Sequence, residues 1–360
     1  MICSAAFWAV LGCVAATADT LRIATFNAEL SRKGPGLLLR DILKGEEQAR
    51  AVAEVIARNA PDILLLNGID YDLDGRTLAA LATLIAAQGH EMPHQFTARP
   101  NSGWATDLDL DGDGKLGGPG DAHGWGRYAG DGGMAVLSRY PIGDVRNLSE
   151  LVWAEQDWAL LPTIDGKLFP SEAALSVQRL SSVAHWVVPV TAKGKVVTLM
   201  GFHATPPVFD GPEDRNGKRN HDEILLWRHL LNGKLGPPGP EEAFVVIGDA
   251  NLDPVDGEGI KSAIRGLLSD ERLQDVQPRS VGAKMSADAV HRGDPALDTA
   301  DWRGAEDGGG PGNLRVDYVL PSSELTVVDA GVFWPAPGES HVELVRTASR
   351  HRLVWVDIDW

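Results

Sequence analysis

Short apolar runs recur along this chain of 360 residues, and most of them end at a polar residue. The run Leu21 to Asn27 alternates apolar and polar residues, which predicts a strand, whereas the continuous run Ile63 to Leu66 predicts a fully buried strand. Further strands are predicted at 134–138, 183–190, 196–202, 243–247, 315–320, 326–333 and 353–358. Apolar residues at helical spacing predict helices at 46–59, 77–87, 222–231 and 260–268, the third of them capped by Asn220. Strands that alternate with helices without a clean linker favour one α/β domain.

Polar side chains that could carry chemistry stand at the ends of these strands. They are Asn27, Asn67, Asp70, His203, Asp249, Asn251, Asp317 and His351. Each has a structural explanation on its own, since a lone asparagine after a strand is usually a turn residue and a lone histidine is usually packed. Rigid strands aim the side chains at their ends into a common cleft, so the coincidence of so many predicts a shared site.

The segments around these residues resemble the endonuclease/exonuclease/phosphatase superfamily, which has the DNase I-like fold. The similar segments follow the family's order from about residue 21 to the end of the chain: Thr25-Phe26-Asn27, Pro61 through Asp70, Gly133 through Arg139, Phe202-His203, Gly248 through Asn251, Val316 through Tyr318, and Ser349 through His351. The resemblance implies an α/β four-layered sandwich, in which two packed mixed β-sheets are flanked by helices. It also implies a hydrolase in which an activated water cleaves a phosphodiester or a phosphomonoester.

The resemblance further implies roles for the strand-end residues. Asp249 would orient or deprotonate the attacking water, while Asn251 and His203 would hydrogen-bond the phosphate oxygens as charge builds in the transition state. His351 would bind or polarise the phosphoryl group, and Asp317 would fix the tautomer of this imidazole and favour its charged form.

Two positions depart from the family's pattern, and both concern the catalytic metal. The family usually has a glutamate where this chain has Gly68 and an aspartate where it has Arg350. Mg²⁺ needs hard oxygen ligands, so with Asn27 as the chief remaining ligand a catalytic Mg²⁺ is doubtful. Counting these exchanges and the missing ion leaves the pocket one charge more positive than a metal-loaded site.

Three interpretations of this departure stay open. In the first, Arg350 reaches into space vacated at Gly68, takes the place of the cation and, with Asn27, binds the substrate, because arginine is a bidentate phosphate ligand. In the second, the chain is a catalytically inactive family member that binds a phosphorylated ligand or partner. In the third, the metal moves to Asp70 or Asp72, just beyond Gly68.

A long glycine-rich loop at 98–133 resembles the calcium loops of EF-hands and dockerins. The acidic residues at positions one, three and five of this motif are Asp109, Asp111 and Asp113. Carboxylates at alternate positions around a tight glycine turn can converge on one hard cation. The pattern departs at position twelve, where Gly120 stands and Asp121 follows one residue late. A structural Ca²⁺ and a solvated acidic loop without an ion both stay open.

The formal net charge of −17 argues against a polyanionic partner. Proteins that grip nucleic acid usually carry a basic face, so a small or lipid-derived phosphate ester is expected rather than nucleic acid. Three basic residues after His203, namely Arg215, Lys218 and Arg219, could hold an anionic substrate, although a plain surface loop is the favoured explanation, since exposed charges are the norm. Neither the substrate nor the oligomeric state can be deduced from the sequence.

Residues 1–18 have the features of an export signal. Ile2 to Val14 is almost wholly apolar and too short for a comfortable membrane span, and Ala16-Thr17-Ala18 is a small-x-small cleavage pattern. No lysine or arginine precedes the apolar run, and a buried N-terminal element is the alternative. Both cysteines, Cys3 and Cys13, lie in this segment, so the expected mature domain at 19–360 has no disulfide and no transmembrane segment. The expected location is periplasmic or secreted, with lipoprotein anchoring at Cys13 as an alternative.

Overall fold

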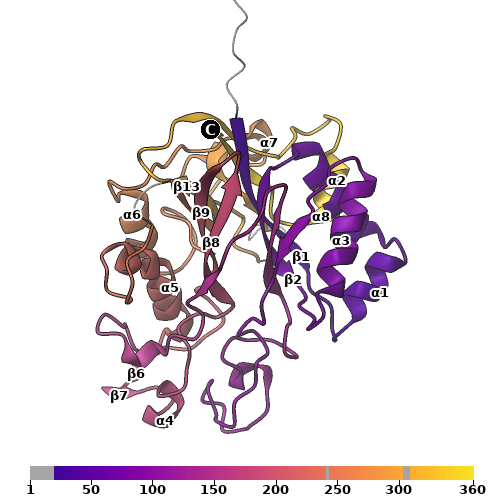
Figure 1. Ribbon diagram of the computed structural model, residues 1–360. Coiled ribbons are helices and arrows are strands. Elements are labelled where there is room, and N and C mark those ends of the chain that lie inside the picture. Colours follow the sequence, from indigo (N-terminus) through magenta and orange to yellow (C-terminus); the bar gives the residue numbers. More distant parts are fainter. Residues whose placement is uncertain (1–19, 241–242, 303–308) are drawn as a thin grey trace, which may run out of the picture.

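The computed structural model describes residues 20–240, 243–302 and 309–360 (Figure 1). The predicted export signal and both cysteines lie outside the described residues. Within these three ranges, no helix combines the length and the apolar character that crossing a membrane requires.

Two mixed sheets form the centre of the structure. The six-stranded sheet has the order β14 (Val327–Val332), β15 (Val354–Asp359), β1 (Thr20–Leu30), β2 (Ile63–Ile69), β4 (Gly133–Ser138) and β3 (His94–Phe96). The five-stranded sheet has the order β13 (Asp317–Pro321), β10 (Phe244–Asp249), β9 (Lys195–His203), β8 (Ala184–Ala192) and β5 (Arg146–Asn147). Each sheet contains one parallel pair, β1 with β2 and β9 with β10, and the other neighbours are antiparallel.

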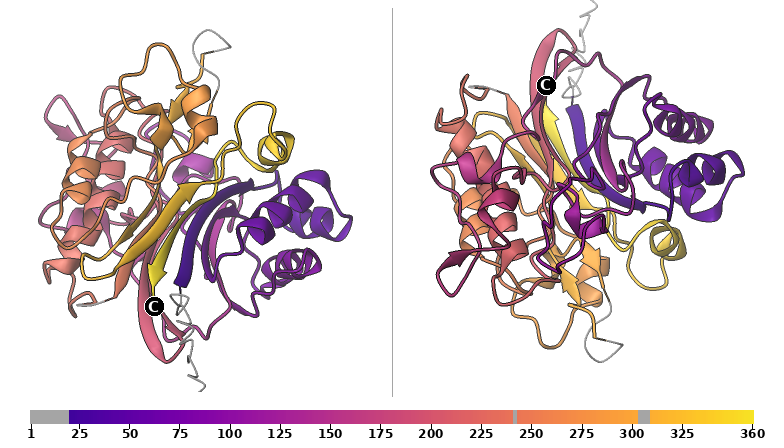
Figure 2. Two further views of the ribbon diagram at one scale, coloured as in Figure 1. Left: turned by 90° about the horizontal axis from the view of Figure 1, so that it is seen from above. Right: turned by 90° about the horizontal axis from the view of Figure 1, so that it is seen from below.

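Helices cover the outer face of each sheet (Figure 2). The six-stranded sheet packs against α1 (Leu37–Leu43), α2 (Glu47–Asn59), α3 (Arg76–Ala87) and α8 (Val342–Ala348). The five-stranded sheet packs against α5 (Arg215–Leu231) and α6 (Ser262–Leu268). Shorter elements lie in the connections: α4 (Glu172–Leu175), α7 (Val281–Met285), the pairs β6 (Thr163–Ile164) with β7 (Lys167–Leu168) and β11 (Ala300–Asp301) with β12 (Asn313–Leu314), and 3₁₀ turns at Pro119–Asp121, Trp153–Glu155 and Pro295–Leu297. The structure thus confirms the α/β sandwich of four layers.

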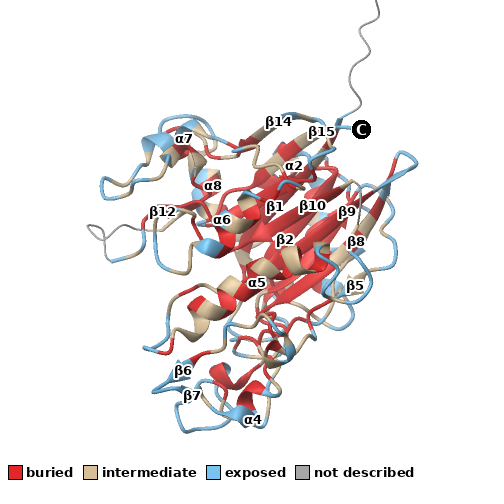
Figure 3. Ribbon diagram, turned by 90° about the vertical axis from the view of Figure 1, so that its left-hand side faces the viewer, coloured by how far each residue is buried: buried red, intermediate tan, exposed pale blue. Residues whose placement is uncertain are grey.

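The two-residue period of the strands explains these layers. In β1, Leu21 and Ile23 pack into the core between the sheets, whereas Ala24 and Phe26 pack against the helices. The same alternation runs through the central strands of both sheets, and Figure 3 shows that these strands are buried on both faces. Burying each large apolar side chain contributes about 1.5–3 kcal/mol, so both faces of each sheet contribute to stability.

The same alternation sends the polar strand ends into the space between the sheets. Asn27 continues the inward row of Leu21 and Ile23, and Asp249 continues the inward row of Val245 and Ile247. Strand pairing places two further strand-end residues beside Asp249. In register, Asp249 pairs with His203 on β9 and with Asp317 on β13. Strand geometry alone therefore gathers these side chains at one edge of the sandwich.

One predicted boundary is wrong. The helix expected at 222–231 begins at Arg215, so Asn220 lies inside α5 and does not cap it. Its side-chain Nδ2 donates to the carbonyl oxygens of Thr205 and Ala250 at 2.7 and 2.8 Å. Side chains in the first turns of α5 are polar because they hydrogen-bond to the backbone of neighbouring loops. A helix prediction based on apolar periodicity does not detect such a segment.

Candidate active site

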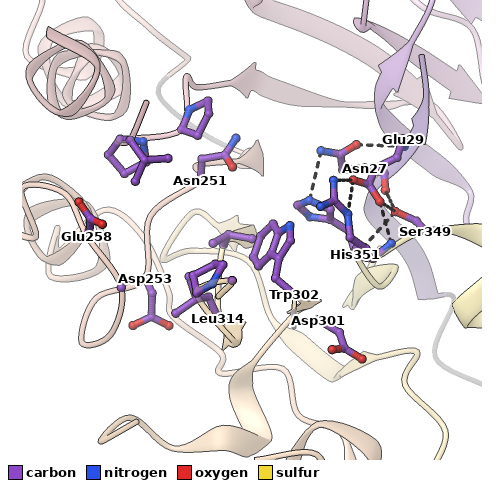
Figure 4. Close-up of a pocket in the computed structure, with 18 of the residues that line it drawn as sticks. Asn27, Glu29, Asn251, Asp253, Glu258, Asp301, Trp302, Leu314, Ser349 and His351 are labelled. Carbon is purple, nitrogen blue, oxygen red and sulfur yellow. Dashed lines mark hydrogen bonds and ion pairs between the residues drawn. The ribbon is translucent and has the colours of Figure 1, made fainter. Parts of the chain in front are cut away.

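A cavity of about 1650 Å³ opens where β1, β9 and β10 end. Figure 4 shows Asn27, Glu29, Ser349 and His351 close together on one side of it, with Asn251 farther along the wall. His203 and Arg350 also line the cavity. The cavity wall therefore includes four of the eight strand-end residues, namely Asn27, His203, Asn251 and His351.

Behind this wall lie two buried carboxylates, Asp249 beside Asn27 and Asp317 beside His351. Asn27 Nδ2 donates to Asp249 Oδ2 at 2.9 Å and lies 3.5 Å from His351 Nε2. His351 Nδ1 lies 2.9 Å from Asp317 Oδ2, which also accepts a hydrogen bond from Thr299 Oγ1 at 2.8 Å. A carboxylate on Nδ1 fixes the proton at that nitrogen, so Nε2 is the nitrogen of His351 that is directed toward Asn27.

The net effect of burial and neighbouring charges is to raise the pKa values of Asp249 and His351, and both shifts favour proton transfer at this site. Burial, followed by the charge of Asp317, raises the pKa of Asp249 to about 7. Burial opposes the charged form of His351, but the charges of Asp317 and Asp249 outweigh it and raise its pKa to about 9. Near neutral pH the site therefore holds a carboxyl that exchanges protons readily beside a cationic imidazolium.

His203 and Asn251 flank the same carboxylate. His203 Nε2 lies 3.5 Å from Asp249 Oδ2, and burial together with the charge of His351 lowers the pKa of His203 to about 3, so this ring is neutral. Asn251 adopts φ +49°; its backbone N–H donates to Asp249 Oδ1 at 2.8 Å and its Nδ2 donates to the Ala204 carbonyl at 2.9 Å. One hydrogen on Nδ2 stays available for a further acceptor.

The space beside Gly68 is not vacant. A Cβ atom on this glycine, which has φ +71°, would lie 2.4 Å from Asn27 Oδ1 and 3.0 Å from the backbone nitrogen of Glu29. Arg350 therefore does not enter this space, contrary to the expectation from the sequence. Its guanidinium pairs with the carboxylate of Glu29, through Nε at 2.8 Å and through Nη2.

Glu29 is the site residue that the sequence reasoning missed. It lies two residues after Asn27 on β1, in a bulge between Asn27 and Leu30 that interrupts the pairing with β2. Its carboxylate also accepts hydrogen bonds from Ser349 Oγ at 3.1 Å and from the backbone N–H of Arg350 at 2.8 Å. Burial opposes its ionisation, but these bonds from Arg350 and the charge of His351 lower the pKa of Glu29 below its usual value.

The residues present do not fit the Mg²⁺ that the resemblance implies at this place. Position 68 offers no side chain, position 350 offers a cation, and Asn27 Oδ1 accepts the backbone N–H of Glu29 at 3.2 Å. Both carboxylate oxygens of Glu29 are already bonded to Ser349 and Arg350. Elsewhere in the site, Asp249, Asp317 and His351 bring ligand atoms within 4.8 Å of one another and could hold a metal ion.

Asp70 and Asp72, the other places considered for a metal, are used by the backbone. Asp70 accepts hydrogen bonds from the N–H groups of Arg32 and Gly132 at 2.9 and 3.1 Å. Asp72 accepts those of Arg76 and Thr77, at 2.9 and 2.7 Å, at the start of α3. Neither lines the large cavity, so the structure does not bring these two carboxylates to the candidate site.

The three basic residues after His203 do not line the cavity either. Arg215 Nη1 donates to the Leu110 carbonyl, and Lys218 Nζ donates to a backbone carbonyl of the preceding turn at 2.8 Å. Arg219 is buried and donates to the Leu180 carbonyl at 2.8 Å. All three lie in α5 rather than in a surface loop, and the structure brings none of them to the cavity wall.

The acidic loop forms a second cluster, with one member exchanged. Asp109, Asp111 and Asp121 place ligand atoms within 4.8 Å of one another and could hold a metal ion. Asp121 replaces the expected Asp113 because the 3₁₀ turn at Pro119–Asp121 folds back toward the start of the loop. Asp113 instead accepts the backbone N–H of Lys115 at 2.7 Å.

Comparison with protein families gives one match over most of the chain. The matching family is described as the Endonuclease/Exonuclease/phosphatase family, and the match covers residues 24–351. This range includes every residue of the cavity wall named above, from Asn27 to His351. No curated protein matches the sequence.

Solved structures with a similar fold include an endonuclease/exonuclease/phosphatase from Beutenbergia cavernae DSM 12333. It is 19% identical with a TM-score of 0.55, and the alignment covers 94% of this chain and 71% of that chain. A family protein from Leptotrichia buccalis C-1013-b is 16% identical with a TM-score of 0.51, over 94% of this chain and 100% of that chain. At these identities the likeness shows the fold.

Proposed function

Because the chain belongs to the endonuclease/exonuclease/phosphatase family, we propose that it hydrolyses a phosphate ester with water as the nucleophile. The observation that carries this proposal is the arrangement of Asp249 and His351 around Asn27. Their pKa values of about 7 and about 9 leave a proton acceptor and a proton-bearing cation side by side over a common pH range.

In the proposed reaction, the wall residues bind the phosphate and Asp249 accepts the proton. His351 Nε2 and the spare hydrogen on Asn251 Nδ2 donate to phosphate oxygens, and His203 contributes a neutral ring beside them. A water that reaches Asp249 Oδ2 between Asn27 and His203 gives up a proton to it as the water oxygen bonds to phosphorus. The bond from phosphorus to the ester oxygen then breaks, and this oxygen leaves with the bonding electron pair and takes up a proton from solvent. Asp249 then releases its proton to solvent.

Turnover of bis-p-nitrophenyl phosphate and p-nitrophenyl phosphate tests this proposal. The purified protein is expected to release nitrophenol from at least one of them, with the rate unchanged by excess EDTA. Asp249→Asn is the matched control, because asparagine keeps the shape and cannot accept the proton. No release by the native protein at any pH from about 5 to 10, a range that spans both raised pKa values, would sink the proposal.

A second candidate function is binding without hydrolysis. The observation that favours it is the presence of Gly68 and Arg350 at the positions of the family's metal carboxylates. A catalytically silent member would bind inorganic phosphate or a phosphorylated ligand in the cavity and release no product. Phosphate binding without turnover of either ester would favour this function.

For the substrate, we favour a small or lipid-derived ester over nucleic acid. The net charge of −17 supports this choice, as does the mixed wall of the cavity, which includes Pro206, Pro207, Phe209 and Trp302. Side-by-side turnover of a glycerophosphodiester, a phospholipid and single-stranded DNA distinguishes these classes. Faster cleavage of DNA than of both smaller esters would contradict the choice.

We propose that Asp109, Asp111 and Asp121 bind a structural Ca²⁺. The carboxylates come from both ends of one loop, so an ion there would close it, and Arg215 already ties this loop to α5 at the Leu110 carbonyl. Calcium at a hundred times its dissociation constant would stabilise the fold by about 2.7 kcal/mol. A thermal midpoint unchanged by millimolar Ca²⁺, or raised equally in Asp109→Asn, would contradict the site.

We also propose that residues 1–18 direct export and that 19–360 form the mature domain. The small-x-small pattern at Ala16-Thr17-Ala18 supports this assignment. The mass of the protein recovered from an exporting cell tests it. An uncleaved chain would contradict cleavage before Asp19, and a lipid adduct on Cys13 would support anchoring instead.

A further inference from the structure

Glu29, Gly68 and Arg350 form one interlocking arrangement at the cavity wall. Between Asn27 and Leu30, two residues of β1 stand opposite the single residue Gly68 of β2. Glu29 takes φ +48° in this bulge, a conformation that non-glycine residues seldom adopt. A bulge of this kind commonly re-aims a side chain next to a functional site.

The glycine at position 68 is a condition for this arrangement. Any side chain there would collide with the amide oxygen of Asn27 and with the backbone of Glu29. A carboxylate at position 68 would therefore require the Asn27 side chain and the bulge at Glu29 to shift. The carboxylate that the family places on β2 is absent, and a carboxylate from β1 occupies the neighbouring position.

Glu29 fixes the orientation of Arg350. Its Oε1 accepts from Nε and Nη2 of the guanidinium, and its Oε2 accepts from the backbone N–H of Arg350 and from Ser349 Oγ. Within the described ranges, Nη1 of Arg350 has no hydrogen-bond partner. The side chain is 61% exposed and lines the cavity next to His351, so this free edge is accessible to a ligand.

An ordinary surface ion pair does not explain this geometry. Exposed ion pairs contribute little to stability, whereas a left-handed backbone at a glutamate and an obligatory glycine beside it are both costly. Structures retain such strain mainly where it serves a site. Counting charges at positions 68 and 350 and the missing ion left the pocket one charge more positive than a metal-loaded site. That count omitted Glu29, whose carboxylate cancels this extra positive charge.

We propose that Glu29 is a positioning residue that holds Arg350 as a fixed cation where family members bind their metal ion, and that the free edge of the guanidinium binds a phosphate group. This inference rests on the proposed function only in assuming that phosphate enters the cavity. It accounts for Gly68, Glu29 and Arg350 together, as parts of one phosphate site that needs no divalent ion.

Isothermal titration with inorganic phosphate in excess EDTA tests the inference without requiring turnover. The native protein is expected to bind phosphate equally with EDTA and with Mg²⁺. Arg350→Ala is expected to weaken binding by about 10- to 100-fold, because a charge-assisted contact is lost. Arg350→Lys is expected to recover only part of it, since lysine cannot use the same fork on Glu29.

Glu29→Gln separates positioning from simple neutralisation. If Glu29 only cancelled the charge of Arg350, removing its own charge would tighten phosphate binding. If Glu29 holds the guanidinium in place, the variant binds phosphate more weakly, and this is the expected result. Tighter binding by Glu29→Gln would overturn the positioning role.

A matched control is the exposed pair Glu54 and Arg58 on α2, which lies outside the cavity wall. Glu54→Gln and Arg58→Ala are expected to leave phosphate affinity unchanged, and circular dichroism of every variant checks the fold. Phosphate binding that requires Mg²⁺ and survives Arg350→Ala would overturn the inference even if the esters are hydrolysed. Arg350-dependent binding without hydrolysis would uphold it while the proposed activity fails.

Discussion

The two sheets end in the same cavity, but they handle charge there in opposite ways. The five-stranded sheet brings Asp249 and Asp317 to near-complete burial, where the charge of Asp317 helps to raise the pKa of Asp249 and both carboxylates raise the pKa of His351. The six-stranded sheet brings Glu29, whose ion pair with Arg350 is open to solvent. The buried end can exchange protons near neutral pH, and the exposed end carries a fixed charge whose value does not change there.

Under the proposed function, the buried end would transfer protons and the exposed end would bind the ligand electrostatically. Low dielectric surroundings strengthen the interactions at the buried end, and removing a group from it leaves another charge without its partner. Water screens the exposed end, so a change there is expected to act mainly on ligand affinity. Substitutions at each end can break or sharpen this comparison.

The largest effect is expected at Asp249. Asp249→Asn keeps the hydrogen-bonding shape beside Asn27 but cannot accept a proton, so kcat should fall by about 10²- to 10⁴-fold, as for loss of a general base. Nitrophenol release under single-turnover conditions measures this loss. A variant that keeps more than about a tenth of the native rate would show that proton acceptance lies elsewhere.

A smaller effect, with a distinctive direction, is expected at Asp317. Its charge raises the pKa values of both Asp249 and His351, so Asp317→Asn should move both limbs of the pH–rate profile toward lower pH. At about pH 10, on the alkaline side of the native pKa, the rate should fall roughly tenfold for each pKa unit that His351 loses. The imidazole resonances of His351 in a pH titration report the same shift directly. An unmoved alkaline limb would contradict the role of Asp317.

The pH–rate profile of the native protein should be bell-shaped with limbs near 7 and 9, because Asp249 must be ionised and His351 protonated.

The same two groups predict how the free energy of unfolding changes with pH. Both folded pKa values exceed the ordinary values of 3.8 and 6.5, so the folded state binds protons more tightly than the unfolded state. The free energy of unfolding should therefore fall as pH rises from about 4 to 7 for Asp249 and from about 6.5 to 9 for His351. Urea unfolding across this range checks the slope.

The smallest effect on activity is expected from the glycines. Gly68 and Gly75 have similar positive φ values, +71° and +66°, but only Gly68 has atoms crowding the position of a Cβ. Gly75→Ala should cost only the backbone term, about 1 kcal/mol, while Gly68→Ala should cost roughly 1–3 kcal/mol more and weaken phosphate binding by displacing Asn27 or Glu29. Equal losses in both variants would show that the crowding at Gly68 is relieved without strain.

The parts of the site that the sequence predicted are those governed by the two-residue period of a strand. Asn27, His203, Asp249 and Asp317 all continue inward-facing rows, which is why the strand ends that the sequence singled out meet between the sheets. Glu29 was missed because the bulge breaks this period, and its direction depends on a left-handed φ that no sequence pattern encodes.

The same limit explains the other differences. Asp121 joins the acidic cluster in place of Asp113 because a 3₁₀ turn returns it to the start of the loop, a contact that residue spacing does not predict. Arg219 and Asn220 were assigned to a loop because they are polar, although burial against backbone carbonyls makes them part of α5. Helix prediction from the spacing of apolar residues cannot detect a helical turn whose polar side chains bind backbone carbonyls.

The pairing of β1 with β15 sets the order in which the site can form during synthesis. Thr20 pairs with Asp359, and Asn27 meets His351 across 324 positions of sequence. Contacts of such long range close late and slowly, so a nascent chain still lacking its last strand cannot yet bring His351 to Asn27. The candidate active site is therefore expected to be among the last parts of this protein to form, and loss of a short C-terminal stretch should abolish it while leaving most of the sequence intact.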